Sequence, residues 1–95
     1  MTTNSIWLFH GMNGRFASGV FTEKEMAEQW IYNNRLTGVL TAYPINTGVY
    51  DWAIQEGLFT PKNESQGSPE FIGKFTTAGQ KHYHYENGIA DGAAE

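Results

Sequence analysis

Two histidines near the C-terminal end, in the segment His82-Tyr83-His84, are the residues best suited to chemistry. Alternate residues of a β-strand point to the same face, so both imidazoles would share a face with the carboxylate of Glu86. Imidazole nitrogen and carboxylate oxygen are common ligands of divalent metals. A bare His-x-His pair is a weak signal, because a site needs three or four ligands. We therefore predict no bound metal and keep these three residues as candidates. The competing interpretation has Tyr83 and Tyr85 packed inward and both imidazoles in water.

A catalytic set is hard to assemble from the remaining polar residues. Ser18, His10 and Asp51 would suit a nucleophile, a base and its orienting group, but no nucleophile elbow surrounds Ser18. Asp51 and Glu56 are five residues apart and do not stack on one helix face. The segment from Gly11 to Arg15 lacks the Gly-Lys-Ser/Thr ending of a phosphate-binding loop. We predict no enzymatic activity and no cofactor, with a small enzyme as one alternative.

Composition limits the class of protein further. The net charge is -4, and the six Lys and Arg residues are scattered singly, which argues against nucleic-acid binding. The chain has no cysteine, which fits a reducing cytosol. Residues 1–5 lack the features of a signal peptide, and no apolar run reaches the length of a membrane span. The expectation is a cytoplasmic protein of one small domain, residues 1–95, with 1–5 and 89–95 flexible.

The N-terminal third predicts a β-hairpin that runs into a helix. Residues 6–10 form a strand candidate, Asn13-Gly14 is a hairpin turn signal, and residues 16–21 form the return strand. A two-residue turn there places Leu8 opposite Gly19, whose missing side chain leaves room for a large neighbour such as Trp30.

A helix should follow this return strand. Thr22 and Glu25 have the spacing of a capping box, and Phe21 and Met26 that of a hydrophobic staple. The helix should end at Asn33-Asn34, because asparagine tolerates left-handed geometry.

The rest of the chain alternates between strand and helix signals. Residues 37–45 predict a third strand, 80–86 predict the last one, and Asn87-Gly88 turns or ends it. The segments between them are a helix at 49–56 with Thr47 as cap and Gly57 as stop, a loop at 60–67, and a helix at 69–77 capped by Ser68, with a strand at 71–76 as the alternative. The predicted fold is α+β: a two-layer sandwich with a mainly antiparallel sheet of three to four strands, in the order β-hairpin, helix, strand, helix, short helix, strand.

Aromatic residues make up 15% of the chain, more than so small a core needs. Tyrosine and tryptophan are enriched at protein interfaces, so we predict binding roles for Tyr50, Trp52, Tyr83 and Tyr85. The alternative is that a second aromatic layer, under the 49–56 and 69–77 helices, closes the other sheet face. Self-association through exposed strand edges is also open.

Several stretches together resemble a family of short bacterial proteins classed as a domain of unknown function. The resemblance covers roughly residues 6–88 and rests on the Trp7 to Ile31 block with Gly-Arg-Phe-x-Ser-Gly-Val-Phe at 14–21, and on 36–44, 48–53, 68–72 and 82–88. It implies a stand-alone bacterial protein and carries over no activity or site residue. The resulting hypothesis is a non-enzymatic interaction module that binds a protein partner or itself, without nucleic acid or membrane. The alternatives are a small-ligand or metal-binding protein using His82 and His84, and a small enzyme.

Overall fold

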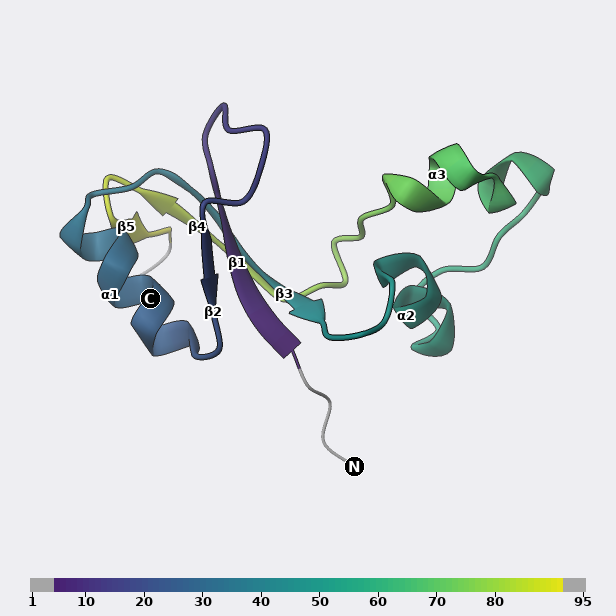
Figure 1. Cartoon of the computed structure of the whole chain (residues 1–95), viewed down its shortest axis with the longest axis horizontal. Coiled ribbons are helices and arrows are strands. Elements are labelled where there is room, and N and C mark those ends of the chain that lie inside the picture. Colours follow the sequence, from purple (N-terminus) through teal and green to yellow (C-terminus); the bar gives the residue numbers. More distant parts are fainter. Residues whose placement is uncertain (1–4, 92–95) are drawn as a thin grey trace.

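The computed structural model describes residues 5–91. A five-stranded antiparallel sheet in the order β2-β1-β3-β4-β5 carries one helix, α1, on one face (Figure 1). The elements are β1 (Ser5–Gly11), β2 (Gly19–Phe21), α1 (Lys24–Asn33), β3 (Gly38–Pro44), α2 (Val49–Gln55), the 3-10 helix η1 (Glu64–Gly67), α3 (Pro69–Gly73), β4 (His82–Glu86) and β5 (Ile89–Ala90). The α+β class and the antiparallel sheet are confirmed, but the predicted strand number was too low.

The first hairpin forms with a different register from the predicted one. Leu8 pairs with Val20, and Phe9 pairs with Gly19. A turn closed by the Gly14 amide donating to the Gly11 carbonyl lies one residue earlier than Asn13-Gly14, and Asn13 takes a left-handed φ of 67°. The return strand is Gly19–Phe21 and not 16–21, and this longer connection gives the observed register. The predicted role of Gly19 holds, since a Cβ there would lie 2.9 Å from Cζ3 of Trp30.

Helix α1 begins without the predicted capping box. Glu23 is the N-cap, no side chain caps the helix, and Met26 is 59% exposed instead of stapling to Phe21. The Phe21 ring packs instead on Trp30, with ring centres 5.4 Å apart. The helix ends at Asn33 as predicted, although the left-handed residue after it is Arg35, with a φ of 53°.

The core lies between α1 and one face of the sheet. Ala27 and Ile31 of α1 meet Phe9 and Leu40 of the two central strands, and all four are at most 1% exposed. Tyr85 of β4 completes this cluster at 4% exposure. Burial of these side chains provides the main stabilisation of the sheet and helix, at about 1.5–3 kcal/mol for each large apolar group.

The C-terminal end continues past the predicted last strand. Asn87 and Gly88 both have positive φ, 52° and 86°, which is the geometry of a tight hairpin turn. Ile89 and Ala90 then pair with Glu86 and Tyr85. Ser5 starts β1, so the segments predicted to be flexible, 1–5 and 89–95, each include strand residues. Residues 1–4 and 92–95 lie outside the described part of the chain.

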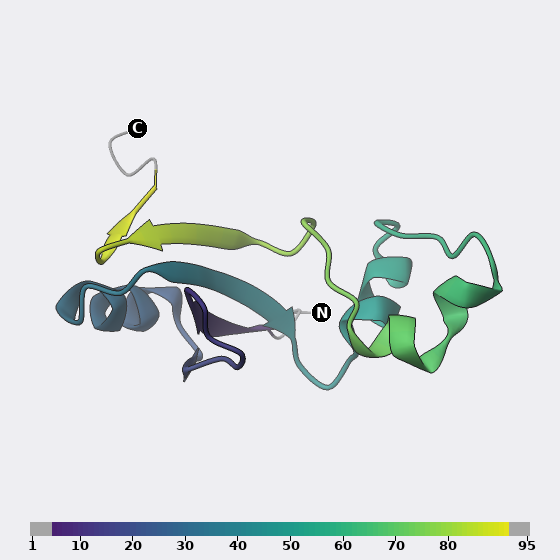
Figure 2. The same ribbon diagram turned by 90° about the horizontal axis from the view of Figure 1, so that it is seen from above.

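A helical lobe, residues 45–81, connects β3 to β4 and lies beyond the end of the sheet (Figure 2). Its centre is a cluster of aromatic rings, with centres 4.8–6.2 Å apart, made by Tyr50, Phe59, Phe71 and Phe75. The alternative interpretation, in which the 49–56 and 69–77 helices cover the second sheet face, is therefore wrong. The lobe has its own small core.

The ends of the lobe's helices follow the sequence signals in part. Ser68 caps α3 as predicted, accepting from the Phe71 amide at 3.1 Å. Thr47 does not cap α2, whose N-cap is Gly48, whereas Gly57 provides the predicted left-handed stop with a φ of 75°. The predicted 69–77 helix is shorter, Pro69–Gly73, and the alternative strand does not form.

Candidate functional site: the open face of the sheet

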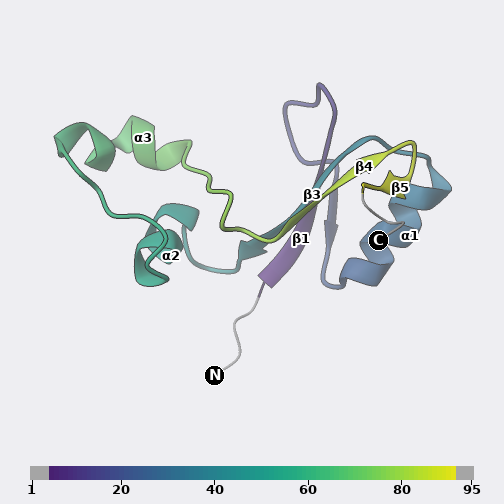
Figure 3. The same ribbon diagram turned by 180° about the vertical axis from the view of Figure 1, so that it is seen from behind.

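Strand register divides the side chains of the sheet between two faces. One face carries Phe9, Leu40 and Tyr85 and packs on α1. The other, called the open face, is covered by none of the helices in the described chain (Figure 3). Its residues are Ile6, Leu8, His10, Val20, Val39, Thr41, Tyr43, His82, His84, Glu86 and Ile89.

The open face is apolar in its middle and poor in charge. Val20 is 60% exposed and Ile89 is 50% exposed, which is high for side chains of this kind. Among the paired strand residues of this face, Glu86 is the one acidic residue and none is Lys or Arg. Asp91, directly after β5, borders the face. A surface of this composition suits contact with protein better than contact with a charged ligand.

All three histidines of the chain lie on the open face. His10 of β1 and His84 of β4 both pair with Val39 of β3, so His10, Val39 and His84 form one row across the sheet. A shallow hollow of about 800 Å³ is lined by His10, His84, Glu86 and Asp91, among others. His82 lies beside His84, with ring centres 5.4 Å apart and the ring planes at 83°.

Backbone carbonyl groups orient two of the histidine rings. His82 Nδ1 lies 2.7 Å from the carbonyl oxygen of Gln80, and His10 Nε2 lies 3.1 Å from that of Gly14. A carbonyl oxygen only accepts, so the contacting nitrogen carries the proton. In the neutral rings, Nε2 of His82 and Nδ1 of His10 are then left as acceptors.

A single chain does not complete a metal site. Within residues 5–91, no three His, Cys, Asp or Glu side chains are arranged to hold a metal ion. His82, His84 and Glu86 do share one face, as the period of two predicts. They form a partial ligand set rather than a site.

Two of the four aromatic residues predicted to bind a partner are buried. Tyr50 is 9% exposed in the lobe, where its hydroxyl donates to the Gln66 carbonyl at 2.8 Å. Tyr85 is 4% exposed under α1. Both therefore stabilise the fold, and their prediction as surface anchors is wrong.

The other two predicted anchors are partly exposed. Trp52 is half-buried and borders a hollow of about 340 Å³ between the lobe and the end of the sheet. Tyr83 is 39% exposed, with Lys24 Nζ 4.0 Å from its ring centre and Trp7 beside it. Binding roles for Trp52 and Tyr83 stay predictions.

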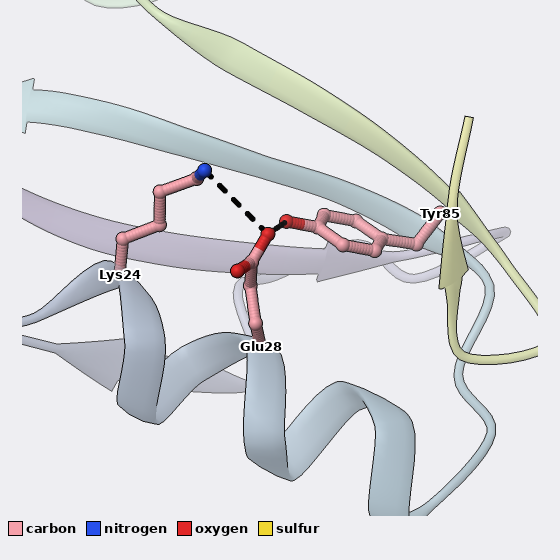
Figure 4. Close-up of polar contacts among 3 residues, drawn as sticks. All are labelled: Lys24, Glu28 and Tyr85. Atoms are coloured by element: carbon pink, nitrogen blue, oxygen red, sulfur yellow. Dashed lines mark hydrogen bonds and ion pairs between the residues drawn. The ribbon is translucent and has the colours of Figure 1, made fainter. Parts of the chain in front are cut away.

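A polar contact fixes β4 to α1 on the covered face. The Tyr85 hydroxyl donates to Glu28 Oε2 at 2.6 Å, and Lys24 Nζ lies 3.6 Å from the same oxygen (Figure 4). Burial raises the pKa of the Tyr85 hydroxyl well above its ordinary value, and the hydrogen bond to Glu28 and the charge of that carboxylate add to the rise. The covered face is thus held together by this contact as well as by apolar packing.

The variant Tyr85→Phe should lower the free energy of unfolding by about 1 kcal/mol at pH 7, because Glu28 loses its hydrogen-bond donor. Because the pKa of Tyr85 is higher in the folded than in the unfolded chain, its contribution to stability is fully present below the unfolded pKa of 10.0. This contribution is lost as the pH rises from there through the folded pKa. The free energy of unfolding of the wild-type protein should therefore fall as the pH rises above 10.0. Its difference from that of the variant should become smaller. Urea denaturation between pH 7 and pH 11 measures both effects, with the exposed Tyr32→Phe as control. An advantage that stays constant with pH would contradict this account.

Comparison with known proteins identifies the family. The model of the family described as Domain of unknown function (DUF7710) matches residues 6–91. The chain belongs to the DUF7710 family. Nearly all of the sheet and the whole helical lobe of this DUF7710 protein lie within the match. No curated protein and no solved structure matches it.

Among the described residues of this DUF7710 chain, no helix has the length and apolar character needed to cross a membrane.

Proposed function

We propose that the protein is a non-enzymatic interaction module that binds a second copy of itself through the open face. The observation that carries this proposal is the uncovered apolar surface of a sheet whose opposite face packs on α1. Sheets that pack face to face lie about 10 Å apart and interdigitate their inner side chains. The cysteine-free chain and the resemblance to short bacterial proteins support a cytoplasmic setting in a bacterial cell.

The charge distribution favours a second copy as the occupant. A strongly acidic partner would find no Lys or Arg among the strand residues of this surface, and a strongly basic one would find Glu86 only at one end. Two copies of the open face bring together apolar side chains such as Leu8, Val39 and Tyr43, with Glu86 displaced to one end. The acidic residues Glu23 and Glu25, next to or within α1, stay outside this contact.

The size of the surface predicts a weak dimer. With strands about 4.8 Å apart and a rise of about 3.3 Å per residue, the paired strand residues cover a projected area of about 400 Å² per copy. Side-chain relief brings the accessible area buried by two copies to about 1,000 Å², the lower end for specific interfaces. We therefore expect a dissociation constant in the micromolar range or weaker. The corresponding free energy of dimerisation is about -8 kcal/mol or weaker.

Sedimentation velocity over a concentration series, with a chelator present, tests the proposal. The wild-type protein should shift from monomer to dimer as concentration rises. Val39→Lys, at the centre of the open face, should remain monomeric because the new charge would be desolvated in the contact. Val20→Lys places the same charge on a side chain already 60% exposed, so it tests the face without disturbing the core.

A matched control comes from α1. Met26→Lys makes a similar change at 59% exposure on the other side of the sheet, and it should dimerise like the wild-type protein. A wild-type chain that stays monomeric over the whole series would refute the proposal. Equal loss of dimer in the Met26 and Val39 variants would refute the open face as the contact.

A further inference from the structure

The three histidines make an incomplete ligand set that a second copy can complete. His82 and His84 have ring centres 5.4 Å apart. Two imidazoles that share a tetrahedral zinc ion, with Zn–N of about 2.0–2.1 Å, have ring centres about 5 Å apart. The Nδ1 of His82 is held by the Gln80 carbonyl, which is the usual arrangement around a metal-binding imidazole. The pair therefore has the spacing and the orienting contact of two ligands, and it lacks a third.

Strand order shows where the third ligand comes from. The longest strands are β1 and β3, and β3 is the middle strand of the order β2-β1-β3-β4-β5. Of the two-fold axes that bring two open faces together, we take the one along β3, because it joins the histidine rows of the two copies: it places β1 of one copy opposite β4 of the other. The row His10–Val39–His84 then faces the same row in reverse. His10 of each copy meets His84 of the other, with Val39 facing Val39.

We infer that the protein binds a divalent transition metal, with zinc as the best fit, between two copies of the chain. The ligands are His82 and His84 of one copy and His10 of the other, so a dimer holds two equivalent sites. This inference rests on the proposed dimer. Opposing imidazoles reach each other because sheets packed face to face are about 10 Å apart.

The ligand chemistry selects the metal class. Imidazole nitrogen suits zinc, copper and nickel, whereas calcium and magnesium prefer oxygen ligands. The ring of His10 is oriented like that of His82, because one ring nitrogen donates to the Gly14 carbonyl and the other is left as an acceptor. Two metal ions per dimer would tighten an interface whose apolar area alone is small.

Zinc binding and dimerisation are measured together on the full chain. Equilibrium dialysis should give about one zinc ion per chain at saturation, and sedimentation should show the dimer at lower protein concentration with zinc than with chelator. Magnesium at the same concentration should have no effect. His10→Gln and His84→Gln should each weaken zinc binding by more than about 10-fold, since loss of a ligand exceeds loss of an outer-shell contact.

A mixture of the two variants decides whether the ligands come from different copies. In a mixed dimer, one site has His84 from the His10→Gln copy and His10 from the His84→Gln copy, so that site is intact. The equimolar mixture should therefore bind about one zinc ion per four chains with the affinity of the wild-type protein, whereas each variant alone binds zinc only with the weakened affinity. A mixture that binds no more zinc than the separate variants would overturn the inference.

The two proposals fail in distinguishable ways. A wild-type dimer that forms in chelator and is unaffected by zinc removes the metal site and leaves the proposed dimer standing. Zinc binding by a monomer, unchanged in His10→Gln, also overturns the shared site. A chain that is monomeric with and without zinc overturns both proposals.

Discussion

Replacement of Gly38 by alanine is expected to remove much of the stability of the protein. A Cβ at this position in β3 would collide with the carbonyl oxygen of His10, and it would lie 2.7 Å from Phe9 Cζ and 2.9 Å from Gly11 Cα. Two of these atoms belong to the backbone of the neighbouring strand, and the Phe9 ring is only 1% exposed, so none can move without disrupting the pairing or the core. We expect a loss of about 3 kcal/mol or more, which is much of the stability of a small domain.

Thermal denaturation followed by circular dichroism measures this effect. Gly73→Ala is the matched control, because a Cβ on this residue of α3 meets no atom within 4 Å. That variant should melt at the wild-type temperature or slightly above it, since alanine is the better helix residue. A Gly38→Ala protein that melts like Gly73→Ala would show that the two strands are farther apart than the structure has them.

The second large effect is expected from Tyr50→Ala, which should unfold the helical lobe. The Tyr50 ring contacts Phe59, Phe71 and Phe75, with ring centres 5.8, 6.2 and 5.5 Å away. Removal of a buried aromatic side chain costs about 3–5 kcal/mol. The lobe has no other aromatic side chain so deeply buried among the residues described, and little of it contacts the sheet.

Hydrogen exchange resolved along the chain distinguishes local from global unfolding. In Tyr50→Ala, amides of residues 45–81 should lose protection while those of β1 and β3 keep it. Tyr50→Phe retains the ring and loses only the bond to the Gln66 carbonyl, so it should cost about 1 kcal/mol and leave the lobe folded. Equal loss of protection in lobe and sheet would mean that both unfold as one cooperative unit.

Local signals predicted the fold where one segment contains the whole cause. The α1 helix follows from its amphipathic spacing, and the Ser68 cap of α3 follows from Ser-Pro at a helix start. The hairpin register depended instead on where the return strand begins, which is Gly19, several residues after the turn, and an Asn-Gly pair does not specify that. The absent capping box at Thr22 has a tertiary cause, since Phe21 is drawn onto Trp30 and the helix begins one residue later than the box requires.

The candidate site was predictable only in part for a similar reason. Alternation along β4 correctly placed His82, His84 and Glu86 together. It does not say which face a helix will cover, so the buried position of Tyr85 could not be decided from spacing. Tyr50 is buried by rings that are distant in the sequence, Phe59, Phe71 and Phe75, and local spacing does not predict such contacts. The row with His10 depends on β3 lying between β1 and β4, which is a property of strand order across the whole chain.

The position of the helical lobe between β3 and β4 has a consequence for how such a chain can evolve. The lobe leaves the sheet at the end of β3 and rejoins it at the start of the adjacent β4. Two hydrogen bonds close the lobe where it meets the sheet: the Ala42 amide donates to the Lys81 carbonyl at 2.9 Å, and Gln80 Nε2 donates to the Ala42 carbonyl at 3.2 Å. Residues can be gained or lost above this closure without shifting the register of any strand. Doubling the length of such a connection costs only about 0.6 kcal/mol of closure entropy. The lobe is therefore the part of the molecule in which insertions, deletions and new binding specificities can accumulate while the sheet stays the same.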